Sequence, residues 1–153
     1  MNTDKNGLRK VVNRLFRYET MSGFGACPVY MERWTLARGF DCAVYLHHFT
    51  GDDWSRDPHD HPRRFISIGL KGWYYEDVFD RTGQLINTTK YQAPWLRSFP
   101  PEHVHRIRAA ENNGATWTLV IVLPKRRDWG FIREGKWIPF KEYVFGGKAR
   151  KNC

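Results

Sequence analysis

From residue 29 onward the chain alternates between short runs of β-branched and aromatic residues and clusters of Gly, Pro, Asn and Asp. Runs of this length and composition, bounded by turn residues, are typical of β-strands. Turn signals such as DRTG and ENNG separate them, and strands at this spacing indicate an antiparallel sandwich or barrel. We therefore predict an all-β fold whose strands lie in the runs VYMERWTL, FDCAVYLHHF, RRFISIGL, WYYEDVF, QLINTTKY, WLRSF, HRIRA and TWTLVIVL.

The segment before these runs has a different pattern. In residues 8–18, LRKVVNRLFRY, apolar side chains recur at helical spacing, and the Arg and Lys side chains lie mostly on the other side. This pattern predicts an N-terminal amphipathic helix. Because 153 residues suit a single domain, we divide the chain into an N-terminal helical extension (1–28), a barrel (29–145) and a basic tail (146–153) that we expect to be disordered.

Composition excludes several other classes of protein. With 41% apolar and 16% aromatic residues, the chain is too hydrophobic to be disordered. It contains no run approaching the ~18–20 apolar residues of a membrane span, and its polar start lacks a secretory signal, so we expect a cytoplasmic protein without a membrane partner. Cys27, Cys42 and Cys153 are widely spaced, which favours neither a disulfide framework nor a zinc knuckle.

The chain is strongly basic, with 25 Lys and Arg against 16 Asp and Glu and a formal net charge of +9. Such a field attracts phosphates, nucleotides or nucleic acid. Lys125, Arg126 and Arg127 lie close to Trp129 and form a candidate basic and aromatic patch for nucleic acid. The sequence offers no recognised nucleic-acid motif, and a solvated basic loop is the commoner reading of such a run.

Four of the six histidines form two H-x-H pairs, His59 with His61 and His103 with His105. Residues two apart on a strand project to one face, so a strand that continued back to residue 59 would align His59 and His61 with Arg63, Phe65 and Ser67. Two imidazoles on one face can bind one cation, and a third ligand must come from elsewhere. We choose His105 for that position; the remaining two histidines are the adjacent His47 and His48.

These histidines lie in segments that resemble the cupin superfamily. HDHPRRFISIGLKG resembles the first cupin motif, with Gly72 at the expected distance, and PPEHVH resembles the second. Over about residues 30–143, the segments YLHHF, WTLVIVLPKRRDWGF and WIPFKEY are similar to small uncharacterised cupin-like proteins of tailed bacteriophages and prophages. The resemblance implies a double-stranded β-helix, a jelly-roll barrel, and a location in the host cytoplasm if a phage encodes the chain.

By motif position, the resemblance implies that His59, His61 and His105 are the metal ligands. The glutamate that usually completes the first motif is replaced here by Phe65. Three neutral histidines suit a divalent transition metal, and we expect Fe(II), with Zn, Ni or Mn as alternatives. The expected function is that of a metal-binding cupin, a non-haem-iron dioxygenase-like or related small-molecule enzyme. The alternative is a non-catalytic cupin module that binds a small anionic ligand, either a sugar or a nucleotide.

Other side chains receive secondary assignments. We assign catalytic roles to Arg63 and His47, which could orient an anionic substrate or carry a proton. Strand parity turns Asp60 away from the ligands, and the sequence leaves open whether His103 or Glu76 joins the site. Asp77 and Glu102 are the other nearby acids. Exposed edge strands in small barrels often pair, so we also expect a homodimer.

Overall fold

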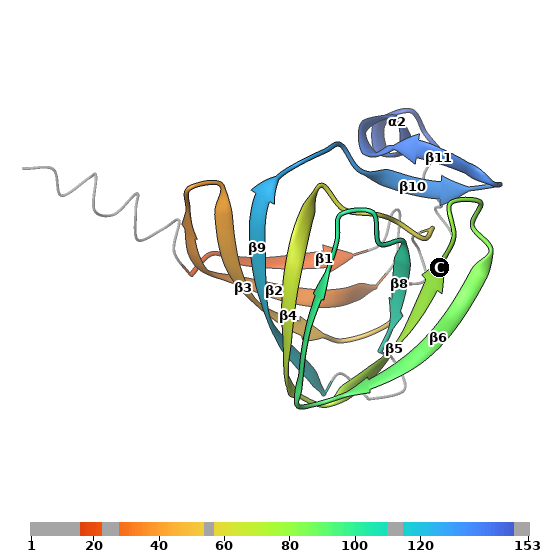
Figure 1. The fold of residues 1–153 in the computed structure, drawn as a ribbon. Coiled ribbons are helices and arrows are strands. Elements are labelled where there is room, and N and C mark those ends of the chain that lie inside the picture. Colours follow the sequence, from red (N-terminus) through yellow and green to blue (C-terminus); the bar gives the residue numbers. More distant parts are fainter. Residues whose placement is uncertain (1–15, 23–27, 54–56, 110–114, 149–153) are drawn as a thin grey trace, which may run out of the picture.

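The computed structural model describes residues 16–22, 28–53, 57–109 and 115–148 of the chain. Two antiparallel sheets face each other and enclose the interior of a barrel (Figure 1). The larger sheet has the strand order β1 (Tyr18–Ser22), β2 (Val29–Gly39), β3 (Cys42–Phe49), β9 (Thr116–Lys125), β4 (Arg63–Lys71) and β7 (Trp95–Phe99). The smaller sheet has the order β6 (Leu85–Gln92), β5 (Trp73–Phe79) and β8 (His105–Arg108).

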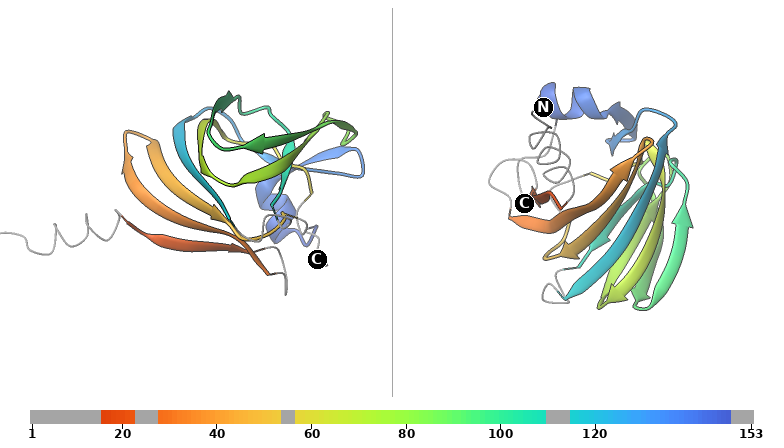
Figure 2. Two further views of the ribbon diagram at one scale, coloured as in Figure 1. Left: turned by 90° about the horizontal axis from the view of Figure 1, so that it is seen from below. Right: turned by 90° about the vertical axis from the view of Figure 1, so that its left-hand side faces the viewer.

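A separate hairpin and a short helix complete the described chain. The hairpin pairs β10 (Gly130–Arg133) with β11 (Lys136–Pro139), and α2 (Phe140–Phe145) follows directly. Both lie together beside one end of the barrel (Figures 1 and 2). No helix in these ranges is both long enough and apolar enough to cross a membrane.

The predicted all-β fold is confirmed, and each of the eight predicted runs contains a strand. The sequence did not predict β1, the β10–β11 hairpin or α2. Residues 8–15 of the predicted N-terminal helix lie outside the described residues, and Tyr18, the last residue of that prediction, begins β1. Strand β3 starts two residues later than predicted, because Phe40 and Asp41 form the β2–β3 turn with positive φ angles of 50° and 56°.

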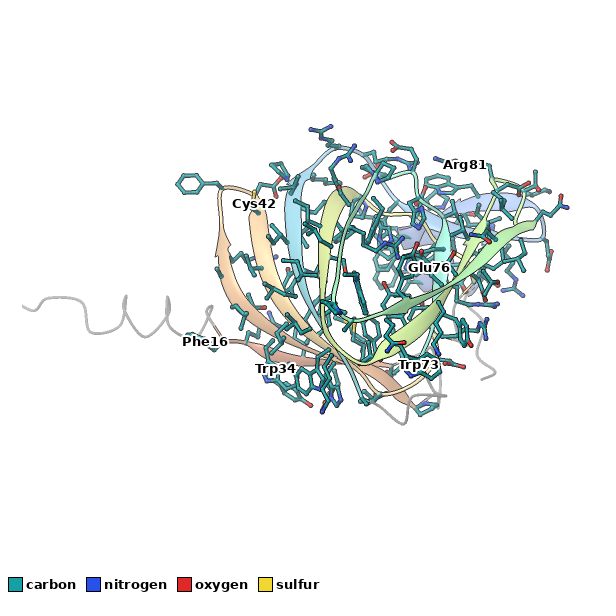
Figure 3. The ribbon with its side chains drawn as sticks, turned by 60° about the horizontal axis from the view of Figure 1, so that its bottom comes forward. Phe16, Trp34, Cys42, Trp73, Glu76 and Arg81 are labelled. Carbon is teal, nitrogen blue, oxygen red and sulfur yellow. The ribbon has the colours of Figure 1, made fainter. Side chains whose placement is uncertain are left out.

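Alternation along the strands of the larger sheet separates an inner from an outer face. On β3, His47 faces the interior and lines a cavity, whereas His48 stacks on Trp117 with ring centroids 4.2 Å apart. Figure 3 shows the same contrast between Trp34, on the outer side of the larger sheet, and Glu76, which lies among side chains between the sheets. Packed clusters fill part of the interior, and the inner faces also line a cavity of about 480 Å³ that opens to solvent.

Gly69 of β4 lies against the ring of Trp95. A Cβ atom at this glycine would come within 2.2 Å of the indole, which packs at 5.1 Å on Tyr74 and donates its Nε1 proton to Ser67. We expect Gly69→Ala to lower the free energy of unfolding by roughly 1–3 kcal/mol, because the ring must move out of a packed site. Urea denaturation measures this loss. Gly39→Ala is the matched control, since nothing lies within 4 Å of its Cβ position, and equal losses in both variants would contradict the prediction.

Candidate metal centre

Backbone hydrogen bonds hold the two H-x-H segments together. The amide of His59 donates to the carbonyl of His105 at 3.2 Å, and the amide of His105 donates back at 3.1 Å. The amide of His61 donates to the carbonyl of Pro101 at 2.8 Å. The expected continuation of β4 back to residue 59 does not occur, because β4 begins at Arg63 and His59 forms isolated bridges with His105 and Phe131. These bridges, rather than strand parity, bring the ligands together.

The side chains of His59, His61 and His105 converge. Each offers one nitrogen, and these nitrogens lie within 4.8 Å of one another. Nε2 of His61 and Nε2 of His105 are 2.8 Å apart. Two nitrogens bound to one ion at 2.0–2.1 Å are about 2.8–3.4 Å apart, so this pair already has a suitable separation. The three residues therefore fit a divalent metal ion.

Glu76 of β5 determines the orientation of the His105 ring. Its side chain is fully buried, and its Oε1 lies 2.5 Å from Nδ1 of His105. Burial alone would raise the pKa of Glu76, but hydrogen bonds from His103, His105 and Arg97 outweigh burial and hold the pKa well below its ordinary value. The carboxylate must therefore accept the Nδ1 proton of His105, which leaves the Nε2 lone pair facing His61. A carboxylate behind a ligating histidine is a common arrangement in metal sites.

Glu76, His103 and His105 form a second cluster with potential ligand atoms within 4.8 Å. It uses the opposite edge of the His105 ring, since Nδ1 rather than Nε2 faces Glu76. The guanidinium of Arg97 already lies 2.6 Å from the other oxygen of Glu76. This positive charge makes the second cluster the poorer cation site, and its geometry is that of a hydrogen-bonded support for His105.

Asp53 is a carboxylate beside the site that the sequence analysis missed. It is 4% exposed and lines the cavity, and its Oδ2 lies 3.8 Å from Nδ1 of His59. It comes from the segment GDDW after β3, where an aspartate is an ordinary loop residue, so no local signal identifies it. In the structure it lies on the Nδ1 side of His59, as Glu76 lies on the Nδ1 side of His105, but at 3.8 Å it is beyond hydrogen-bond distance.

Asp60 points away from the site, as strand parity predicted, although the strand itself is absent. Its fully buried carboxylate accepts hydrogen bonds from the amide of Gly130 at 2.8 Å and from Nη1 of Arg127 at 2.8 Å. Nε1 of Trp137 donates to it at 3.1 Å. Asp60 therefore attaches residues 59–61, which carry two of the proposed metal ligands, to the β10–β11 hairpin.

The two residues assigned catalytic roles lie in different places. His47 lines the cavity, at the level of Thr118, its cross-strand neighbour. Arg63 is not among the described cavity-lining residues; its guanidinium binds the side chain of Asp41 at 2.6 Å and the carbonyl of Leu123 at 3.1 Å. The structure thus brings His59, His61 and His105 together and leaves Arg63 at the β2–β3 turn.

Most residues of the basic and aromatic patch, Lys125 to Arg127 with Trp129, make contacts within the chain. Arg127 pairs with Asp60, and Nζ of Lys125 lies 2.9 Å from the carboxylate of Asp128. Trp129 lines the cavity and stacks on Phe140 with ring centroids 4.5 Å apart. Two of the four patch residues are therefore in ion pairs, and the aromatic one forms part of the cavity wall.

His47 gives the fold a distinct pH dependence. Burial, with a smaller contribution from Arg33, lowers the pKa of His47 from 6.5 to about 3. Between these values His47 binds a proton in the unfolded chain but not in the folded chain, so the contribution of neutral His47 to stability is complete above about pH 6.5 and is lost as the pH falls toward 3. The slope approaches about 1.4 kcal/mol per pH unit. Urea denaturation in EDTA across this range should show a shallower slope for His47→Leu than for wild type or His48→Leu; equal slopes would contradict the assignment.

Comparison with known proteins identifies the fold. No family model and no curated protein matches the sequence. Among solved structures, a cupin 2 conserved barrel domain protein from Rhodopseudomonas palustris has a TM-score of 0.56 at 14% identity, covering 75% of this chain and 76% of that one. A cupin-2 domain protein from Rhodospirillum rubrum has a TM-score of 0.54 at 16% identity, covering 77% and 76%.

An enzyme also belongs to this set. HppE in its Fe(II) form has a TM-score of 0.55 at 11% identity, and the match covers 70% of this chain but only 57% of HppE. At such low identities the likeness concerns the fold. The chain therefore has the fold of a cupin barrel, as the sequence motifs predicted. Its three convergent histidines lie in the wall of the barrel cavity.

Proposed function

We propose that this chain is a metal-dependent enzyme that binds a small molecule, with Fe(II) held by His59, His61 and His105. The observation that carries the proposal is the convergence of three imidazoles, two of them buried, at the wall of a 480 Å³ cavity. Cavities of this size are typical of small-molecule sites. The Fe(II) form of HppE supports the choice of iron, and the hydroxypropylphosphonic acid epoxidase among the matching structures supports an oxidative reaction.

The side chains around the ligands have separate tasks in this proposal. When bound, the metal supplies a centre at which a substrate and an oxidant can meet. Glu76 keeps the proton of His105 on Nδ1, so that Nε2 is available as a ligand. Phe65 and Phe99, whose rings lie 4.6 Å and 5.8 Å from that of His61, exclude water from one side of the site. We further propose that the protein acts in the cytoplasm and that phage cupin-like proteins are its relatives, on the sequence motifs described above.

Metal uptake and oxygen consumption test the proposal. Protein purified without a histidine tag is offered Fe(II), Zn(II), Ni(II) and Mn(II), and the metal content per chain is measured. We expect about one equivalent of ion per chain. An empty protein after all four metals would contradict the metal site. Oxygen consumption by the Fe(II)-loaded protein is then followed across a panel of small thiols, acids and aromatic compounds.

A binding module without catalysis is the second candidate. It is favoured by Phe65, which occupies the position of the usual acidic ligand and contributes an apolar ring beside His61. In that case the metal is structural, and the barrel serves as a receptor. Saturable ligand binding without oxygen consumption by the iron-loaded protein would favour this candidate over the enzyme.

A further inference from the structure

The cavity wall carries very little uncompensated charge. Apart from histidines, the described lining residues with a formal charge are Arg33 and Asp53. Asp53 is a carboxyl group beside His59, so it offers an anion no positively charged partner. Whether the cavity accepts an anionic substrate therefore depends on Arg33.

Arg33 already has a carboxylate partner within the chain, Glu19, which also pairs with Arg17 at 3.0 Å through its other oxygen. Nη2 of Arg33 lies 2.5 Å and its Nε 3.1 Å from Oε2 of Glu19, which projects from the neighbouring strand β1. The hydrogen bond from Arg33 lowers the pKa of Glu19, so the carboxylate is ionised at neutral pH. The guanidinium also lies 4.6 Å from the ring centre of Tyr45. An anionic ligand would therefore have to compete with Glu19 for the charge of Arg33.

His47 offers no positive charge either, because it stays neutral down to about pH 3. The rest of the wall is largely aromatic, with rings from β3, β4, β7 and α2, among them Phe49, Phe65, Phe99 and Phe140. Such a wall gains free energy by burying apolar surface and loses it when a charge is desolvated without a partner.

We infer that the substrate is a compact aromatic or apolar molecule that is uncharged apart from its metal-binding group, and that the Glu19–Arg33 pair excludes substrates with a second anionic group. This inference rests on the proposed function, since it assumes that the ligand binds at the metal. It opposes the expectation of an anionic sugar or nucleotide ligand. Glu19, on a strand that the sequence did not predict, becomes a residue that determines specificity.

Three probes that share the same metal-binding group, a hydroxamate, test the inference. Acetohydroxamate, benzohydroxamate and 4-carboxybenzohydroxamate are titrated calorimetrically into zinc-loaded protein, whose zinc content is measured first. We expect benzohydroxamate to bind about tenfold more tightly than acetohydroxamate, because its ring is buried. The added carboxylate should remove about tenfold of affinity, because it is desolvated without a partner. Equal or tighter binding of the carboxylate probe would overturn the inference.

Variants of two neighbouring glutamates sharpen the test. Glu19→Gln frees Arg33 and should tighten binding of the carboxylate probe about tenfold, while the affinity for benzohydroxamate changes little. Glu32→Gln is the control, because Glu32 binds Tyr18 and His48 on the outer face. An unchanged affinity of Glu19→Gln for the carboxylate probe would contradict the role of the ion pair. If the protein takes up no zinc, both the proposed function and this inference fail. If it takes up zinc but does not prefer the uncharged probe, only the inference about the substrate class fails.

Discussion

Replacing His61 with alanine should reduce the affinity for Zn(II) or Fe(II) more than about 100-fold, the upper range for loss of a residue that merely supports a ligand. His61 belongs to the three-histidine cluster alone, and its Nε2 lies 2.8 Å from that of His105. Without it, two ligands remain, and the ion loses one of its short bonds. Competition with a chromogenic chelator measures the change. The circular dichroism spectrum should be unchanged, since the ring of His61 is only partly buried.

His103→Ala is the matched control, because His103 belongs to the second cluster alone. Its Nε2 donates to Glu76 at 3.0 Å, and Glu76 keeps Arg97 and His105 as partners after the change. We therefore expect a loss of affinity below about tenfold. If His103→Ala lost the metal while His61→Ala retained it, the ion would lie between Glu76, His103 and His105 instead.

The largest expected effect on stability comes from Asp60→Ala. Its carboxylate is fully buried and is shared by Arg127, the half-exposed Arg81, Trp137 and the amide of Gly130. Removing one partner of a buried charged pair leaves the other partner uncompensated and typically costs about 3–5 kcal/mol. The side chain of Arg127 is 25% exposed, so water screens part of its charge and we expect the lower end of that range. Thermal unfolding should show a midpoint lower by about 6–12 °C.

Asp128→Ala is the control for this prediction. Asp128 lies in the same basic loop and pairs with Lys125, but its side chain is 85% exposed. Exposed pairs contribute little to stability, so its unfolding midpoint should stay close to that of the wild type. Both variants are measured in EDTA, so that metal binding does not contribute. Similar midpoints for Asp60→Ala and wild type would show that the hairpin is held mainly by its apolar contacts.

Two kinds of pattern made much of this molecule predictable. Period-two runs such as TWTLVIVL predict strands with one buried face, and β9 indeed alternates between buried and half-buried residues. The H-x-H pairs and the cupin motifs identified the three histidines that the structure brings together, although not through the continuous strand that we expected. The short H-x-H pattern was sufficient to identify these ligands, because the segment that carries His59 and His61 pairs directly with His105 and needs no longer strand.

Features that depend on unusual turns or distant partners could not be predicted. The β10–β11 turn uses Glu134 and Gly135, both with positive φ angles, whereas the strong hairpin signals are Asn-Gly and Asp-Gly. Asp53 and Glu19 acquire their roles only from tertiary contacts with His59 and Arg33. In the sequence, nothing distinguishes an aspartate in a loop, or a glutamate before the first predicted strand, from an ordinary surface acid.

The position of Asp60 between His59 and His61 ties two parts of the chain that are far apart in sequence. Any movement of the β10–β11 hairpin is transmitted to Asp60, and the residues on either side of Asp60 are two of the three proposed ligands. A chain that ends before residue 130 should therefore retain the ion less well, even though every ligand is still present. Ion loading should in turn protect the amides of that hairpin from hydrogen exchange.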